Sequence, residues 1–181
     1  MRYEILGPAR IVDHGRVVAI AGPKLEILLT TLVMRANEEI SADHIVEELW
    51  GRLPPRRARA GLQNYISRLR SVLSPFANGA APILTRGHGY LLSMASPDGS
   101  DMHDFVRLVN EGRSQLHERR ADLAAHSFDL ALRQWRGPVL GGRRGGPVVA
   151  SLAGWLTAAR AECRLLAARL PVAHGGPSEV S

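Results

Sequence analysis

The side chains whose chemistry is easiest to interpret lie in one stretch, residues 62–73. Its apolar residues repeat at helical spacing and form a stripe along one side. They are Leu62, Tyr65, Ile66, Leu69, Val72 and Leu73. The opposite side then presents two amides and a hydroxyl, from Gln63, Asn64 and Ser67. Such groups can hydrogen-bond to base edges, and arginines beside them can bind phosphates.

Positive charge is concentrated around the same stretch. The whole chain carries a net charge of +6, yet no acidic residue lies between Glu48 and Asp98. The basic residues of that segment are Arg52, Arg56, Arg57, Arg59, Arg68, Arg70 and Arg86. The remainder of the chain is close to neutral. This segregation favours a polyanionic partner, although a solvated basic face would have the same composition.

Short strands and three helices are expected to position these groups. Residues 3–20 alternate apolar runs with turn residues, which predicts two or three antiparallel strands. Pro23 then begins an amphipathic helix. Ser41 is a good N-cap for a second helix, which Gly51 ends. The third helix, with the polar side, follows the prolines at 54–55.

A β-hairpin is expected directly after the third helix. Residues 83–85 and 90–92 are strand-like, and the tip between them is basic and rich in glycine. Glycine permits the positive φ angles of a tight turn and the close approach of a backbone. Arg86 and His88 therefore become candidate contacts with a nucleic-acid backbone. Strands, three helices and a terminal hairpin together describe a winged helix.

The second half of the chain is predicted to be helical. Residues 101–117 and 121–135 each carry an apolar stripe and form an expected antiparallel pair. Small and aromatic residues within the pair have tetratricopeptide-like spacing, which lets two helices pack closely. They are Gly112, Ala124, Phe128 and Ala131. A flexible connector at 141–146 precedes a third helix over 148–170. The expected fold class is mainly α with small β-sheets: a winged helix-turn-helix domain plus an α-helical tetratricopeptide-like domain.

Clusters of proline and glycine suggest the borders between these units. We expect a winged-helix domain at 1–95, a partial helical domain at 96–170 and a flexible tail at 171–181. Helical repeat domains usually need about three repeats, so one helix pair plus a third helix looks truncated. That helix must pack back on its neighbours, pair with another chain or remain exposed, and the sequence leaves these alternatives open.

Three motifs resemble a known family. LQNYISRLRSVL (62–73) and ILTRGHGYLL (83–92) are similar to the recognition helix and wing of OmpR-type regulators. The order of motifs from residue 5 onward, with WRGPVL at 135–140, is similar to the Streptomyces antibiotic regulatory protein (SARP) family. Two residues depart from the family pattern: Gly61 inside the helix and Asn64 on its outer side.

The resemblance implies an OmpR-type DNA-binding domain followed by a bacterial transcriptional activation domain. It implies an activator of secondary-metabolite (antibiotic) biosynthesis genes. Such a protein binds direct repeats in promoters as a head-to-tail pair, which would be a possible homodimer on double-stranded DNA. It also contacts RNA polymerase. The expected DNA-binding residues are Arg56, Arg57, Gln63, Asn64, Ser67, Arg68, Arg70, Arg86 and His88. The alternative is a DNA-binding regulator that has lost activation and acts as a repressor or as a competitor of a full-length relative.

The remaining reactive residues disfavour an enzyme. The seven histidines show no metal-binding spacing. Cys163 is the single cysteine, so it forms no internal disulfide, and its apolar helix favours a buried, inert thiol. We therefore expect no cofactor and no metal. No apolar run approaches the roughly 20 residues that span a membrane, and no leader opens the chain, which predicts a cytoplasmic, nucleoid-associated protein without membrane contact.

Overall fold

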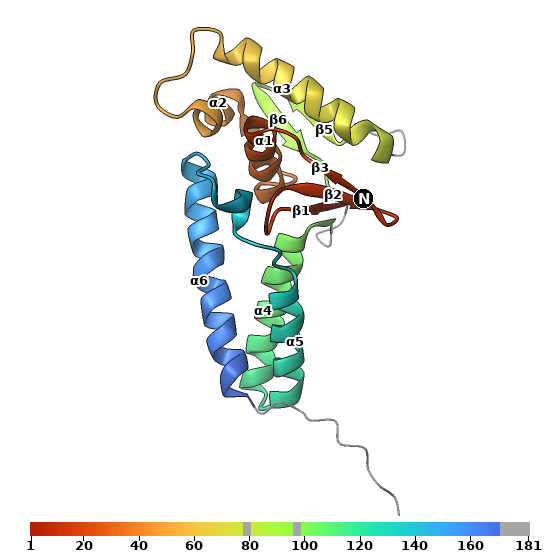
Figure 1. The fold of residues 1–181 in the computed structure, drawn as a ribbon, viewed down its shortest axis with the longest axis vertical. Coiled ribbons are helices and arrows are strands. Elements are labelled where there is room, and N and C mark those ends of the chain that lie inside the picture. The colour runs from red at the N-terminus through yellow and green to blue at the C-terminus, as the bar shows by residue number, and fades with distance from the viewer. Residues whose placement is uncertain (78–80, 96–98, 171–181) are drawn as a thin grey trace, which may run out of the picture.

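The computed structural model describes residues 1–77, 81–95 and 99–170. Two small sheets and the first three long helices lie together, and the last three helices extend away from them side by side (Figure 1). The strands are β1 (Arg2–Glu4), β2 (Arg10–Asp13), β3 (Arg16–Ala19), β4 (Ile40–Ser41), β5 (Ile83–Arg86) and β6 (Gly89–Leu92). The helices are α1 (Pro23–Met34), α2 (Ala42–Trp50), α3 (Ala58–Leu73), α4 (Asp101–His117), α5 (Ala121–Arg133) and α6 (Pro147–Arg169), with 3-10 helices η1 (Ser74–Phe76) and η3 (Val139–Gly142). This confirms the expected fold class. The tail expected at 171–181 lies outside the described residues.

The N-terminal segment forms a three-stranded antiparallel sheet in the order β1-β2-β3. Tyr3 lies opposite Ile11, and Ile11 lies opposite Val18 on the next strand. The turn between β2 and β3 consists of His14 and Gly15, both with positive φ, which matches the twist of a tight hairpin. The prediction of two or three strands is confirmed, with three.

Helix α1 is buried on every side. Pro23 suits the first helical position, and all ten residues from Leu25 to Met34 are buried. The sequence predicted an amphipathic helix, which is wrong here. The side that α2, α3 and β6 leave open is covered by α6 and η3. Residue spacing within α1 does not indicate this cover, because the covering elements lie more than a hundred residues away in the chain.

Helices α2 and α3 begin and end close to their predicted positions. The Ser41 hydroxyl accepts a hydrogen bond from the backbone N–H of His44 at 3.2 Å, and α2 ends at Gly51, whose φ is 70°. Gly61 has a packing role. A Cβ at that position would lie 3.3 Å from two ring atoms of Trp50, so the small residue lets α3 lie close to the end of α2.

The predicted hairpin is confirmed and has a partner strand that was not predicted. The second sheet has the order β4-β6-β5, because Ile40 and Ser41 pair with Tyr90 and Gly89. A two-residue strand is too short to show alternation in the sequence. Gly89 is needed for this pairing, since a Cβ there would lie 2.0 Å from the carbonyl oxygen of Ile40.

Helices α4 and α5 form the close pair that the small residues predicted. A Cβ at Gly112 would lie 2.5 Å from the ring of Phe128. Ala124 and Ala131 are completely buried on the same side of α5. The short side chains therefore let the two helices approach each other, as in a tetratricopeptide-like repeat.

Helix α6 packs back on its neighbours, one of the three alternatives that the sequence left open. Its first turns contact α1 and α2, and its later turns lie along α5 (Figure 1). Leu156, Ala159 and Cys163 are buried on that side. Trp155 is 51% exposed and lines a hollow between α6 and the end of α1, and Leu165 is 61% exposed.

A buried carboxylate joins the N-terminal sheet to the helical pair. Asp101, at the start of α4, accepts hydrogen bonds from the backbone N–H groups of Ile5 and Leu6 at 2.8 and 2.9 Å. Arg136, in the WRGPVL motif, donates its backbone N–H to Leu6 at 2.8 Å and its guanidinium to the carbonyl oxygen of Pro8 at 3.0 Å. Burial raises the pKa of Asp101 to about 6, although these donors oppose that shift. Buried residues of both halves thus form one continuous cluster.

Two glycine substitutions test the helix packing. Gly112→Ala is expected to lower the free energy of unfolding by about 1–3 kcal/mol, because the added methyl group overlaps the Phe128 ring. Gly154→Ala is the matched control, since a Cβ there meets nothing within 4 Å and the helix gains about 1 kcal/mol of propensity. Urea unfolding should show opposite shifts for the two variants. Shifts in the same direction would contradict the close packing of α4 on α5.

Candidate nucleic-acid interface

Helix α3 presents its polar side to solvent. Gln63, Asn64 and Ser67 are exposed, whereas Leu62 and Ile66 on the opposite side are buried. We call the three exposed residues the polar face of α3. The helix lies at the end of the molecule farthest from the free ends of α4 and α5 (Figure 1). Nothing among the described residues covers the polar face, so a large partner can reach it.

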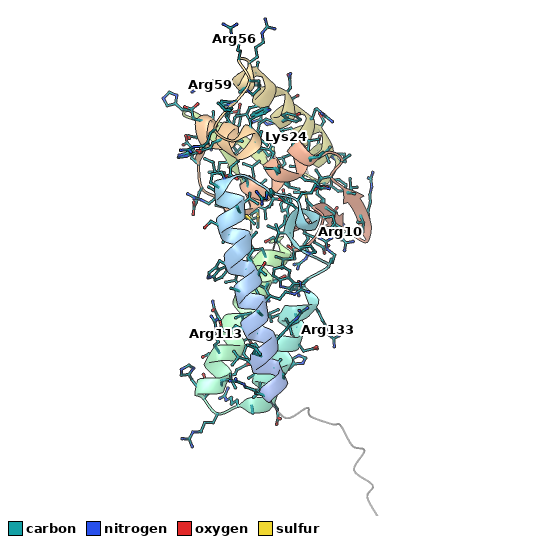
Figure 2. All side chains as sticks on the ribbon, turned by 60° about the vertical axis from the view of Figure 1, so that its left-hand side comes forward. Arg10, Lys24, Arg56, Arg59, Arg113 and Arg133 are labelled. Carbon is teal, nitrogen blue, oxygen red and sulfur yellow. The ribbon has the colours of Figure 1, made fainter. Side chains whose placement is uncertain are left out.

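The arginines before and at the start of α3 differ in their surroundings. Arg56 and Arg57 are exposed, and Arg56 projects from the end of the molecule that lies away from Arg113 (Figure 2). Arg59 instead forms two hydrogen bonds with the Asp43 carboxylate of α2, at 2.6 and 2.8 Å. Both side chains of that ion pair are mostly exposed, so the pair contributes little to stability, but it leaves Arg59 partly neutralised.

Arg68 and Arg70, which the sequence suggests are equivalent, have different contacts. Arg68 is exposed and its guanidinium lies 5.9 Å from the ring centre of Tyr65. Arg70 is half-buried and turned toward the hairpin. Its Nε donates to the carbonyl oxygen of Ile83 at 3.0 Å, and its Nη2 donates to the hydroxyl of Thr85 at 2.9 Å. Arg70 therefore ties α3 to the wing, a role that only the position of β5 reveals.

The tip of the wing lies beside the start of α2. Arg86 and His88 are exposed, and Gly87 between them has a φ of 39°. The carbonyl oxygen of His88 accepts a hydrogen bond from the backbone N–H of Ala42 at 3.0 Å. Glu39 also lies near Gly87, so the tip is not purely basic. The sequence placed this acidic residue outside the basic segment.

The elements bring several of these residues around one hollow. Its volume is about 240 Å³, and it lies between the start of α2, the first half of α3 and the wing. The side chains with polar groups that line it are Arg59, Gln63, Thr85, His88 and Tyr90. Of the predicted site residues, Gln63 and His88 therefore share one hollow, and Arg59 and Thr85 are additions that sequence reasoning did not select.

Metal binding and thiol chemistry find no support among the described residues. Residues 1–77, 81–95 and 99–170 contain no group of three or more histidines, cysteines or carboxylates that could hold a metal ion. Cys163 is buried, and burial raises the pKa of its thiol to about 11, which keeps the sulfur protonated and unreactive. None of the described helices is both long and apolar enough to cross a lipid bilayer.

Sequence comparisons divide the chain in the same order as the motifs. Residues 19–92 match the family described as transcriptional regulatory protein, C terminal, and residues 100–180 match the bacterial transcriptional activator domain. The transcriptional regulatory protein MoaR1 of Mycobacterium tuberculosis is 31% identical over 145 residues, which cover 80% of this chain and 47% of MoaR1. The regulatory protein DnrI of Streptomyces peucetius is 33% identical over 146 residues, which cover 77% of this chain and 53% of DnrI.

The chain belongs to the SARP family. It carries the two regions of a SARP-type transcriptional regulator in their order. A solved structure agrees: the Mycobacterium tuberculosis EmbR chain, in complex with a low-affinity phosphopeptide, is similar with a TM-score of 0.83 and 29% identity. That match covers 92% of this chain and 44% of the EmbR chain. The chain spans about half the length of MoaR1 and DnrI and a smaller share of EmbR.

Arg68→Ala and Arg70→Ala separate a surface arginine from a structural one. Arg70→Ala removes two hydrogen bonds and should lower the free energy of unfolding by about 1–2 kcal/mol. Arg68→Ala should change it by no more than about 0.5 kcal/mol, because the side chain is exposed. Thermal unfolding of the two variants at one pH measures this difference. Equal melting temperatures would mean that Arg70 does not hold the wing.

Proposed function

We propose that this SARP-family chain binds duplex DNA through α3 and the wing. The observation that carries the proposal is the exposed polar face of α3, with arginines at both ends and a basic hairpin tip beside it. A helix of this kind fits the major groove, where amide and hydroxyl groups distinguish base pairs. The tip of the wing then lies near an adjacent phosphate backbone or minor groove.

The surroundings of the candidate residues support different roles. Gln63, Asn64 and Ser67 are proposed to contact base edges, because they occupy the centre of the exposed side. The exposed arginines and the wing tip are proposed to contact the DNA backbone. They are Arg56, Arg57, Arg68, Arg86 and His88. Arg70 is proposed to act through the wing that it positions.

On the scale of the whole regulator, we propose activation of secondary-metabolite genes. The chain would bind direct repeats in a promoter as a head-to-tail pair and contact RNA polymerase, with residues 1–95 binding DNA and 96–170 making protein contacts. It would act in the cytoplasm, at the nucleoid. Membership of the SARP family and the similarity to DnrI support this. Transcription from a promoter with two half-sites tests it, because a repressor or competitor would lower the output that an activator raises.

Arg86→Ala and Tyr90→Ala test the wing. Arg86 is exposed, so its loss should leave the melting temperature almost unchanged, weaken DNA binding, and make the plot of log K against log salt shallower by about one unit. Tyr90 packs against the core, so its loss should lower the melting temperature. Binding titrations at several salt concentrations and thermal unfolding of both variants give the answer. An Arg86→Ala protein with unaltered affinity and salt slope would make the hairpin purely structural.

The polar face of α3 is tested by the DNA sequences that the protein selects from a random pool. The double variant Asn64→Ala, Ser67→Ala should prefer different bases, because each good base contact contributes about 1–3 kcal/mol of discrimination. Ser71→Ala is the matched control: Ser71 is exposed on the same helix, but its hydroxyl is bound to the carbonyl oxygen of Ser67 at 3.1 Å. Identical selected sites for the double variant and the parent would show that α3 does not choose the sequence.

A further inference from the structure

A carboxylate of α2 caps the N-terminus of α6. Glu48 is 3% exposed. Its Oε1 accepts a hydrogen bond from the backbone N–H of Val148 at 2.5 Å, and its Oε2 accepts one from Val149 at 3.2 Å. We call these two hydrogen bonds the α6 latch. They join residues that are about a hundred positions apart in the sequence.

Helix α6 has no cap of its own. Its first N–H groups lack acceptors within the helix, the N-cap residue Gly146 has no side chain, and the first turn has no acidic residue. The buried Glu48 charge also lacks a cationic partner, since no described lysine or arginine forms an ion pair with it. The positive end of the α6 dipole and the two N–H donors are what offset that charge. The Glu48 carboxylate therefore provides acceptors for the first N–H groups of α6, and these N–H groups stabilise the buried charge of Glu48.

The glycines before α6 make the latch possible. A Cβ at Gly146 would lie 2.4 Å from the Cα of Glu48, and one at Gly145 would lie 2.6 Å from the side chain of Val149. The two glycines thus allow the chain to pass close to its neighbours, although the sequence suggested a flexible connector. A second attachment follows the same pattern, because Arg143 forms an ion pair with the buried carboxylate of Glu26 on α1.

Helix α6 connects the two halves of the molecule mechanically. Its N-terminal turns lie on α1 and α2, and its later turns lie on α5 (Figure 1). Helix α2 in turn packs on α3. A change in the position of α6 at the latch would therefore change the angle between α3 and the helical pair.

We propose that Glu48 is a positioning residue that fixes the orientation of the helical pair relative to α3. This orientation decides where the helical part of each copy lies when two copies occupy adjacent half-sites. The consequence for paired sites rests on the proposed function, whereas the orientation itself does not require DNA. Glu48 lies in the core and does not touch the polar face of α3, so its effect on DNA is indirect.

Spin-label distances in the full chain, without DNA, test the orientation. The labels are placed at the exposed positions Ser71 of α3 and Ala161 of α6 through cysteine substitutions, and the parent with its buried Cys163 controls for stray labelling. Glu48→Gln keeps one acceptor but turns an amide NH₂ toward the other N–H, so the distance distribution should broaden. Glu47→Gln is the matched control: it removes the same charge one residue away on an exposed side chain and should match the parent. An unchanged, narrow distribution in Glu48→Gln would overturn the proposal.

Two further measurements decide the matter even if Glu48→Gln fails to fold. Gly146→Ala separates α6 from α2 without removing a charge and should also broaden the distribution. In the parent itself, the amides of Val148 and Val149 should exchange slowly with solvent, because their acceptor is the Glu48 carboxylate. Free exchange of these two amides would contradict the latch.

The effect on paired DNA sites is measured separately. Glu48→Gln should lower the cooperativity of binding to two adjacent half-sites by about fivefold and leave the affinity for one half-site unchanged. Unchanged cooperativity alongside a broadened distance distribution would overturn the link to paired sites. A parent that binds no DNA would refute the proposed function and leave the distance result valid.

Discussion

The structure depends on the complete burial of α1. Ten successive residues of this helix are buried, and a helix without a solvated side needs cover around its whole circumference. The winged-helix elements supply part of that cover, and η3 and α6 supply the rest. The helical half of the chain therefore completes the core of the winged-helix half.

Buried carboxylates make this dependence specific. Glu26 and Glu48 lie in the first half of the chain and are bound by Arg143 and by the N-terminus of α6, while Asp101 in the second half is bound by the amides of the first loop. An isolated buried charge is costly, and an apolar contact alone would allow sliding. Each of these acids is bound by a group from the other half of the chain. These polar contacts thus fix how the two halves are placed relative to each other, in addition to the apolar packing between them.

The candidate interface is what this packing leaves free. Along α3 the apolar residues pack into the core, Gly61 allows close approach to Trp50, and Arg70 is hydrogen-bonded to the wing. The residues that do not take part in these packing contacts form one exposed side of the helix. They are Gln63, Asn64, Ser67 and Arg68. Two acidic residues also lie beside the site, Asp43 on α2 and Glu39 near the wing tip. The site is therefore less uniformly positive than the basic segment of the sequence suggests. Its arginines also differ in their contacts.

The sequence by itself determined the local elements, the family and the polar side of α3. Periodicity, caps and glycines act over a few residues, so the bounds of α2, α3, α4 and the hairpin could be predicted, as could the Gly112 contact. It could not show the burial of α1, strand β4, the wing contact of Arg70 or the capping of α6 by Glu48. Each of these depends on a partner distant in the chain, and residue spacing carries no information about which distant atoms meet. Only the tertiary structure decided that Glu48, an ordinary acidic residue in the sequence, serves a helix that begins about a hundred residues later.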